Sequence, residues 1–286
     1  MRKDAKRVQD VTGLAQICID LKPNRSVSDV YINQKLDVTE LVKYIEKKKK
    51  AGEEYTYFHA FVTAIGKLLY NRPKMNRFVA NRHLYEHNEV IVSFVAKVAF
   101  DDHAEEMMML VPVKPNDNIE TISKQIKNQV DKVRARGEKG KTGGANDIID
   151  VLGKLPNVLR VPVMGAFKWI DKKGLLPASL TGDNLYYSSI IVSNLGSIKC
   201  GAIFHNINDF GTCSSLATFG EIHEEEVIRD GKKSVRKLCE LGVNLDERIA
   251  DGYYFAKSLH VLQDILNNPE SLEDKASEPV ETAEIR

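Results

Sequence analysis

The chain has little net charge, few cysteines and no long apolar run, and each shortage excludes a class of protein. Its 41 basic and 40 acidic residues nearly cancel, so no nucleic-acid partner is expected from long-range attraction. The four cysteines form no C-x-x-C pair, and no histidine pair completes a zinc pattern, so we expect free thiols and no metal. The amino terminus lacks the apolar region of a signal peptide, and we expect a cytoplasmic protein.

The composition is that of one large globular domain, with 43% hydrophobic and 28% charged residues among 286. Strand and helix patterns follow one another without regular βαβ spacing, which favours an α+β fold with a mixed sheet flanked by helices. We expect a single domain over residues 1–270 and a disordered polar tail over 271–286. The glycine-rich segment 137–144 lacks the spacing of a phosphate-binding loop and is expected to be an exposed loop.

Hydrophobic periodicity predicts the individual elements. Alternating apolar residues predict strands at 14–20, 28–36, 78–86, 89–100, 107–113, 186–193, 213–222 and 235–245. Helical spacing predicts helices at about 38–50, 56–72, 119–136 and 252–267. Asp37 is the expected N-cap of the first helix, in a capping box with Glu40.

The apolar stretch 147–176 carries too many charges and prolines to cross a membrane. We predict two or three amphipathic helices there, within an inserted segment 147–180. Three roles stay open for them. They are extra helices packed on the domain, a lid or hydrophobic channel for an acyl chain, or helices that contact a membrane surface.

Two motifs near the carboxyl end carry a specific resemblance. Ser193-Asn194-Leu195-Gly196 ends a strand, and Asp246-Glu247-Arg248-Ile249-Ala250-Asp251-Gly252 leads into the last helix. Together they resemble the catalytic domain of the dihydrolipoamide acyltransferases of 2-oxoacid dehydrogenase complexes, with its I-S-N-L-G and D-H-R-x-x-D-G motifs. Chloramphenicol acetyltransferase is a more distant relative. Upstream, Asp37-Val38-Thr39-Glu40-Leu41 resembles the family's D-V-T-x-L, and Met75-Asn76-Arg77-Phe78 takes the place of its N-A-x-x.

The resemblance implies a chloramphenicol-acetyltransferase-like fold, a two-layer sandwich assembled as a homotrimer with active sites between subunits. It implies CoA as a substrate and no covalently bound cofactor. A histidine removes a proton from a thiol, hydroxyl or amine acceptor, which then attacks the acyl-CoA thioester. By the same resemblance, Ser193 donates a hydrogen bond to the oxyanion and Asp251 orients the site through an arginine. The expected substrate-binding residues are Asn194, Gly196, Arg248 and Gly252.

Glu247 stands where the family has its catalytic histidine. Proton transfer from a thiol of pKa about 8.5 to glutamate, at about 4.3, is harder than transfer to histidine, at about 6.5, by roughly 3 kcal/mol. That difference is roughly a hundredfold in rate. Three alternatives stay open. Glu247 is a base whose pKa is raised by its surroundings, another residue such as His205 supplies the base, or the domain binds CoA or a partner without catalysis.

Overall fold

The computed structural model describes residues 2–97, 106–137, 151–229 and 231–282. Most of the loop predicted at 137–144 lies outside the described residues, as do the start of the apolar stretch at 147–150 and the turn residue Asp230.

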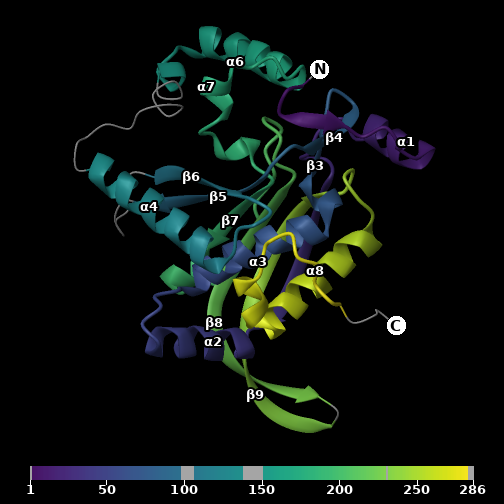
Figure 1. The fold of residues 1–286 in the computed structure, drawn as a ribbon. Coiled ribbons are helices and arrows are strands. Elements are labelled where there is room, and N and C mark those ends of the chain that lie inside the picture. Colours follow the sequence, from purple (N-terminus) through teal and green to yellow (C-terminus); the bar gives the residue numbers. More distant parts are fainter. Residues whose placement is uncertain (1, 98–105, 138–150, 230, 283–286) are drawn as a thin grey trace.

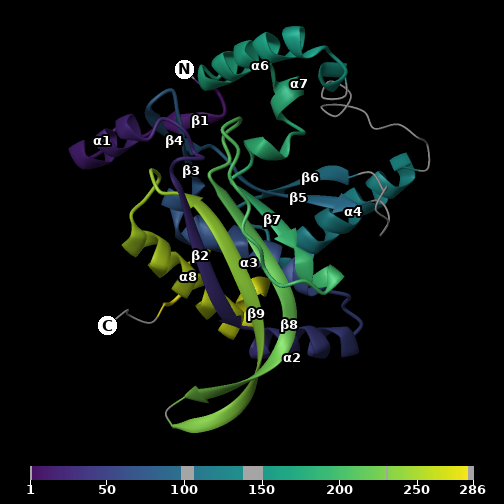
Figure 2. The same ribbon diagram turned by 180° about the vertical axis from the view of Figure 1, so that it is seen from behind.

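A mixed sheet of six strands forms the centre of the described domain (Figures 1 and 2). Its strands are β2 (Asp29–Asp37), β5 (Val90–Lys97), β6 (Glu106–Val113), β7 (Ile190–Asn194), β8 (Ser215–Arg229) and β9 (Lys232–Asp246). The order across the sheet is β2-β9-β8-β7-β5-β6. Strand β7 runs parallel to both of its neighbours, and the other pairs are antiparallel.

Four helices cover one face of this sheet (Figure 1). They are α2 (Thr39–Lys50), α3 (Tyr57–Asn71), α4 (Ile119–Gly137) and α8 (Gly252–Asn267). The core lies between the two layers, where Phe61 of α3 stacks on Phe219 of β8 with ring centroids 4.0 Å apart. The predicted α+β class, a mixed sheet flanked by helices, is confirmed.

Alternation along the strands gives the sheet two different faces. On β9, Leu241, Val243 and Leu245 belong to the core beneath the helices. The residues between them, Gly242 and Asn244, point to the opposite face, where hydroxyl, amide and carboxyl groups gather. This second face, which we call the open face, is seen from the front in Figure 2, and it carries the candidate site.

Smaller elements lie at one end of the domain, at the top of Figures 1 and 2. Strands β1 (Ala5–Arg7), β4 (His83–His87) and β3 (Arg77–Ala80) form a second sheet in that order. Helices α1 (Gly13–Leu21), α6 (Asn157–Lys172) and α7 (Ala178–Thr181) lie beside it. The amphipathic helices predicted within 147–176 are thus represented by α6 among the described residues.

The strand predicted at 14–20 is wrong, because this segment is helix α1. The Thr12 side chain caps it by accepting a hydrogen bond from the Ala15 N–H at 3.3 Å. Only Ile19 of this helix is buried. A short apolar run fits either period, so the Thr12 cap was the better signal.

The strand predicted at 78–86 is also wrong, because it is a hairpin formed by β3 and β4. Asn81 and Arg82 make its turn with positive φ angles of 48° and 62°. Without a glycine at these positions the turn signal is weak, although asparagine tolerates this conformation. Strand β5, which we paired with this segment, joins β6 and β7 instead.

The remaining elements agree with the periodicity, with shifted boundaries. Helix α2 begins one residue later than expected, with Val38 as its N-cap, but the Asp37 carboxylate still accepts the Thr39 N–H at 3.1 Å. Strand β7 is shorter, because residues 185–187 form a 3₁₀ turn capped by the Asn184 side chain. Strands β8 and β9 are longer and continue as a two-stranded hairpin beyond the helix layer (Figure 2).

The tail that we expected to be disordered packs on the core as far as it is described. Leu272 is fully buried and Ala276 nearly so. The Ala276 N–H donates to the Asp117 carbonyl at 2.7 Å, and the Val280 N–H donates to the Asn71 side chain at 2.9 Å. The expectation is therefore wrong for 271–282. A few apolar residues suffice to hold this polar segment.

The substitution Leu272→Ala tests this packing. Truncating a fully buried leucine costs about 2–5 kcal/mol of unfolding free energy, through lost burial and the cavity left behind. Urea denaturation of the variant and wild type measures it. Leu175→Ala is the control, because Leu175 is 67% exposed and its loss should cost less than about 0.5 kcal/mol. Equal small effects at both positions would show that the tail is detached in solution.

A neutral histidine caps helix α3. His59 is buried, and its Nδ1 atom accepts the Thr56 N–H at 3.2 Å, while the His59 N–H donates to the Thr56 hydroxyl at 3.2 Å. Burial lowers the pKa of His59 to about 4, and the Lys127 ammonium adds to this effect. A protonated ring could not accept the Thr56 N–H, so the cap requires the neutral form.

The stability of the fold should therefore fall as the pH falls. Between pH 6.5 and 4 the unfolded His59 binds a proton that the folded one does not, which costs about 2 kcal/mol between pH 7.5 and pH 5. Denaturation at both pH values measures the loss. His59→Gln retains a capping side chain without titrating, so its stability should depend less on pH by about that amount. An unchanged pH dependence in this variant would contradict a neutral His59.

Candidate functional site

Ser193 lies on β7, in a row of residues that crosses the open face of the sheet. It is paired in register with Thr218 of β8, which is paired with Gly242 of β9. The core residue Val192 before it points toward the helices, so Ser193 points away from them and is half-buried. A hydroxyl at this position can donate a hydrogen bond to a group that lies over the sheet.

The chain after Ser193 turns sharply through a 3₁₀ helix, Leu195–Ile198. The Asn194 carbonyl accepts the Ser197 hydroxyl at 2.8 Å. A Cβ atom at Gly196 would lie 2.6 Å from the Gly220 carbonyl oxygen, so only glycine permits this approach. Asn194 and Gly196 thus have a demonstrable role in shaping the turn that follows Ser193.

A loop over residues 199–214 lies along β9 on the open face. The Ile203 carbonyl accepts the Thr218 hydroxyl, and a Cβ atom at Gly242 would lie 2.6 Å from that carbonyl oxygen. The His205 N–H donates to the Asn244 side chain at 3.1 Å. The backbone of this loop is therefore fixed beside Ser193, while the imidazole of His205 is exposed.

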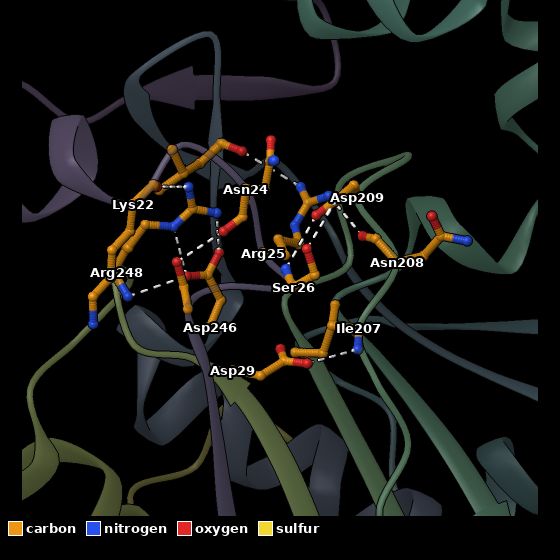
Figure 3. A network of polar contacts seen from close by, with 12 residues as sticks. Lys22, Asn24, Arg25, Ser26, Asp29, Ile207, Asn208, Asp209, Asp246 and Arg248 are labelled. Atoms are coloured by element: carbon orange, nitrogen blue, oxygen red, sulfur yellow. Dashed lines mark hydrogen bonds and ion pairs between the residues drawn. The ribbon is translucent and has the colours of Figure 1, made fainter.

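A buried ion pair closes the end of β9 (Figure 3). The Arg248 guanidinium donates to both carboxylate oxygens of Asp246, at 2.8 Å from Nε and 2.6 Å from Nη2. Its third hydrogen bond goes to the Lys22 carbonyl at 2.7 Å. Asp246 is fully buried, and Arg248 is 5% exposed. Arg248 thereby ties the end of β9 to the segment that precedes β2.

A second arginine, Arg25, lies beside this pair (Figure 3). It is buried, and its Nη1 donates to the Asn208 carbonyl at 3.2 Å. Burial lowers the pKa of Arg25, which the Asp246 carboxylate partly offsets. On β2, burial and the nearby Asp246 and Asp209 carboxylates raise the pKa of Asp29. The Asp209 carboxylate accepts hydrogen bonds from the Ser26 N–H and hydroxyl, each at 3.1 Å.

Glu247 itself lies at the surface of this network. Its carboxylate forms an ion pair with the Lys22 ammonium, and both side chains are more than a third exposed. Its N–H donates to the Ser28 carbonyl at 3.0 Å. An adjacent cation favours the charged carboxylate, and the acidic neighbour Asp246 is already paired with Arg248. Glu247 therefore lies beside a cation at the surface, outside any apolar or anionic pocket.

Asp251 and Gly252 begin the last helix. The Asp251 carboxylate caps α8 by accepting the Tyr254 N–H at 2.8 Å, and Gly252 is the first helical residue. The resemblance assigns Asp251 to an arginine, but in this structure the carboxylate bonded to Arg248 is Asp246. Asp246, Lys22 and Arg25 are contacts that our sequence analysis missed. Only Asp246 had a signal, its place in the D-x-R motif.

Ser193 and Glu247 lie far apart within one chain. Ser193 shares a row with Gly242, two strands away, and Glu247 follows five residues later, directly after the end of β9. At about 3.4 Å per residue and about 4.8 Å per strand, the two positions are separated by roughly 20 Å. The residues that the sequence assigns to one site therefore do not meet within a single chain.

The fold is similar to that of chloramphenicol acetyltransferase and of dihydrolipoamide acyltransferase catalytic domains. Residues 175–273 match the family model of the 2-oxoacid dehydrogenases acyltransferase (catalytic domain). The structure of a probable dihydrolipoamide acetyltransferase from Listeria monocytogenes aligns with a TM-score of 0.59 at 19% identity, over 92% of this chain and 95% of that one. Chloramphenicol acetyltransferase aligns with a TM-score of 0.56 at 12% identity, over 92% and 99%.

The similarity extends to a curated sequence. The lipoamide acyltransferase component of the branched-chain alpha-keto acid dehydrogenase complex of Bacillus subtilis (strain 168) is 23% identical over 274 residues. The match covers 93% of this chain and 53% of that protein, so the chain spans about half the length of this relative. The resemblance inferred from the two motifs is confirmed.

Within the described residues, no three acidic, histidine or cysteine side chains are grouped as a metal site would require. No helix in the same part of the chain is long and apolar enough to cross a membrane. The four cysteines are free, and burial raises the pKa of Cys213 and brings that of Cys239 to about 12. These two thiols are poor nucleophiles at neutral pH.

Asp246→Asn tests whether the buried pair holds the site together. The variant leaves the Arg248 charge buried without its counter-ion, and it should lower the unfolding free energy by about 3–5 kcal/mol. Glu225→Gln is the control, because it breaks the exposed pair of Glu225 with Lys35 and should cost less than about 1 kcal/mol. Denaturation curves of the two variants measure both losses of unfolding free energy. Similar losses in the two variants would mean that the pair of Asp246 and Arg248 contributes little to the fold.

Proposed function

We propose that the protein is an acyltransferase that moves an acyl group from acyl-CoA to a thiol, hydroxyl or amine acceptor. The observation that carries this proposal is the position of the Ser193 hydroxyl. Its hydroxyl stands at the end of β7 on the open face of the sheet, in the motif shared with the family whose model matches residues 175–273. A positioned hydroxyl stabilises an oxyanion without changing its own protonation state.

The active site is completed between two copies of the chain. Ser193 and Glu247 are separated by roughly 20 Å in one copy, from the strand spacings of the sheet. They can act together only where the open face of one copy meets the end of β9 in another. This arrangement agrees with the trimer that the resemblance implies. It also agrees with the name of the Bacillus subtilis relative, a component of a dehydrogenase complex.

Each step of the transfer uses a group of this chain. The Glu247 carboxylate removes the proton from the acceptor, whose lone pair attacks the carbonyl carbon of the thioester. The Ser193 hydroxyl donates a hydrogen bond to the resulting oxyanion. When the intermediate collapses, the carbon–sulfur bond breaks and the CoA thiolate takes the proton back from Glu247. Lys22 pairs with the Glu247 carboxylate and must release it before Glu247 takes a proton, so we expect slow turnover.

That same ion pair supports a second candidate, a module that binds CoA or assembles with partners without catalysis. Lys22 stabilises the charge on Glu247 at the position where the family has its base. In this case the open face still binds CoA, while the chemistry is lost. His205 offers a third route to a base, because its backbone is held at Asn244 on the open face, with the imidazole exposed.

Release of free CoA from acetyl- and longer acyl-CoA, with a panel of thiol, hydroxyl and amine acceptors, tests the proposal. Ser193→Ala should lower kcat by about 100-fold or more through loss of the oxyanion donor. Glu247→Gln should abolish turnover, and Glu247→His should raise it by up to about 100-fold. His205→Gln should leave the rate unchanged. Glu225→Gln, a distant exposed carboxylate, is the control.

The outcomes separate the candidates. If the wild type shows no turnover and the Glu247→His variant does, the site is intact but lacks a base, and the protein is a binding module. Activity lost in His205→Gln and retained in Glu247→Gln would transfer the role of base to His205. Failure of every variant to bind CoA, measured by calorimetry, would contradict both the transfer and the binding proposals.

A further inference from the structure

Helix α6 lies at the outer edge of the domain, away from the helix layer (Figures 1 and 2). It is tied to the domain near its carboxyl end by Asp171, which is buried. The Asp171 carboxylate accepts the Tyr187 hydroxyl at 2.7 Å and the Gly211 N–H at 2.9 Å, and Arg2 donates to its carbonyl at 2.9 Å. The rest of the helix has no other buried residue.

The outward face of α6 is apolar. Val158 is 84% exposed, Val161 is 67% exposed and Trp169 is 62% exposed. Their spacing along the helix places them on one side, opposite the half-buried Phe167 and Ile170. Leu159 is exposed as well. A large exposed apolar patch on a protein domain commonly marks a site of contact with another protein or with a membrane.

The charges around this face have one sign. The exposed or half-buried charged residues of the described segment 151–176 are all basic, and its one acidic residue is the inward Asp171. The basic residues are Lys154, Arg160, Lys168, Lys172 and Lys173. An apolar face with tryptophan, bordered by lysine and arginine, is the pattern of a helix that lies in the interface of an anionic bilayer.

We propose that α6 docks the protein on an anionic lipid surface. Val158, Val161 and Trp169 enter the headgroup boundary, and the lysines contact the acidic headgroups. Charge favours this occupant over a second copy of the same face, because two such faces would bring their basic residues together. The inference is independent of the proposed acyl transfer. It assigns one of the roles that the sequence left open for 147–176.

Trp169 makes the test direct, because it is the single tryptophan of the chain. Its fluorescence is recorded while vesicles of 30% phosphatidylglycerol in phosphatidylcholine are added in 0.1 M NaCl, and binding is measured in parallel by sedimentation. We expect a blue shift and co-sedimentation. Both should weaken strongly on pure phosphatidylcholine and in 0.5 M NaCl, since the attraction is screened.

Matched variants separate the helix from the rest of the surface. Lys168→Glu/Lys172→Glu should lower vesicle affinity by at least about tenfold, whereas Lys47→Glu/Lys49→Glu, with the same charge change on α2, should not. Val158→Ser/Val161→Ser should reduce binding, and Leu14→Ser/Leu21→Ser should not, although both of these leucines are 75% exposed. All of these side chains are exposed, so folding should be unaffected, which circular dichroism checks.

Three results would overturn the proposal. The first is an absence of vesicle binding in the wild type in 0.1 M NaCl. The second is a blue shift of Trp169 that depends on protein concentration in the absence of vesicles, which would assign the face to contact between copies. Equal losses in the α2 and α6 lysine variants would also exclude a specific role for α6.

Discussion

The position of the segment that carries Glu247 depends on one buried interaction, the ion pair of Asp246 and Arg248. Two charges removed from water are tolerated only when their hydrogen bonds are satisfied. Here the guanidinium bonds to both oxygens of the carboxylate and to the Lys22 carbonyl. The pair fixes the end of β9 and the segment before β2 relative to each other. Glu247, between the two partners in sequence, takes its position from them.

The same geometry explains why the candidate site is divided. Ser193 belongs to the parallel centre of the sheet, and Glu247 directly follows the end of β9, an antiparallel strand two positions away. Nothing within one chain can bring them together, because the intervening strand β8 is continuous and hydrogen-bonded on both sides. If Ser193 and Glu247 act on one substrate, as we propose, they do so from different copies of the chain. Its catalytic capacity then also depends on how far Lys22 restrains Glu247.

Most of the fold could be predicted from periodicity, and the failures have physical causes. The helices that cover the sheet show clear apolar stripes, and their limits were nearly correct. The strand prediction for 14–20 failed because only Ile19 of this segment is buried in α1, so burial does not impose a period. The hairpin at 78–86 failed because its turn uses Asn81 and Arg82 and no glycine. The prediction of a disordered tail failed because its buried apolar residues, such as Leu272 and Ala276, are few among polar ones.

The site could be predicted less completely. Motifs identified Ser193 and the segment around Glu247, but motifs do not reveal long-range contacts such as those of Lys22 and Arg25. The measurement that tests the central claim most directly is complementation between subunits. Ser193→Ala and Glu247→Gln chains are co-expressed and purified as mixed assemblies, and CoA release is compared with that of wild type. If each site uses Ser193 from one copy and Glu247 from another, random mixing should restore about a quarter of the wild-type activity. An active wild type with a silent mixture would contradict a site formed between copies.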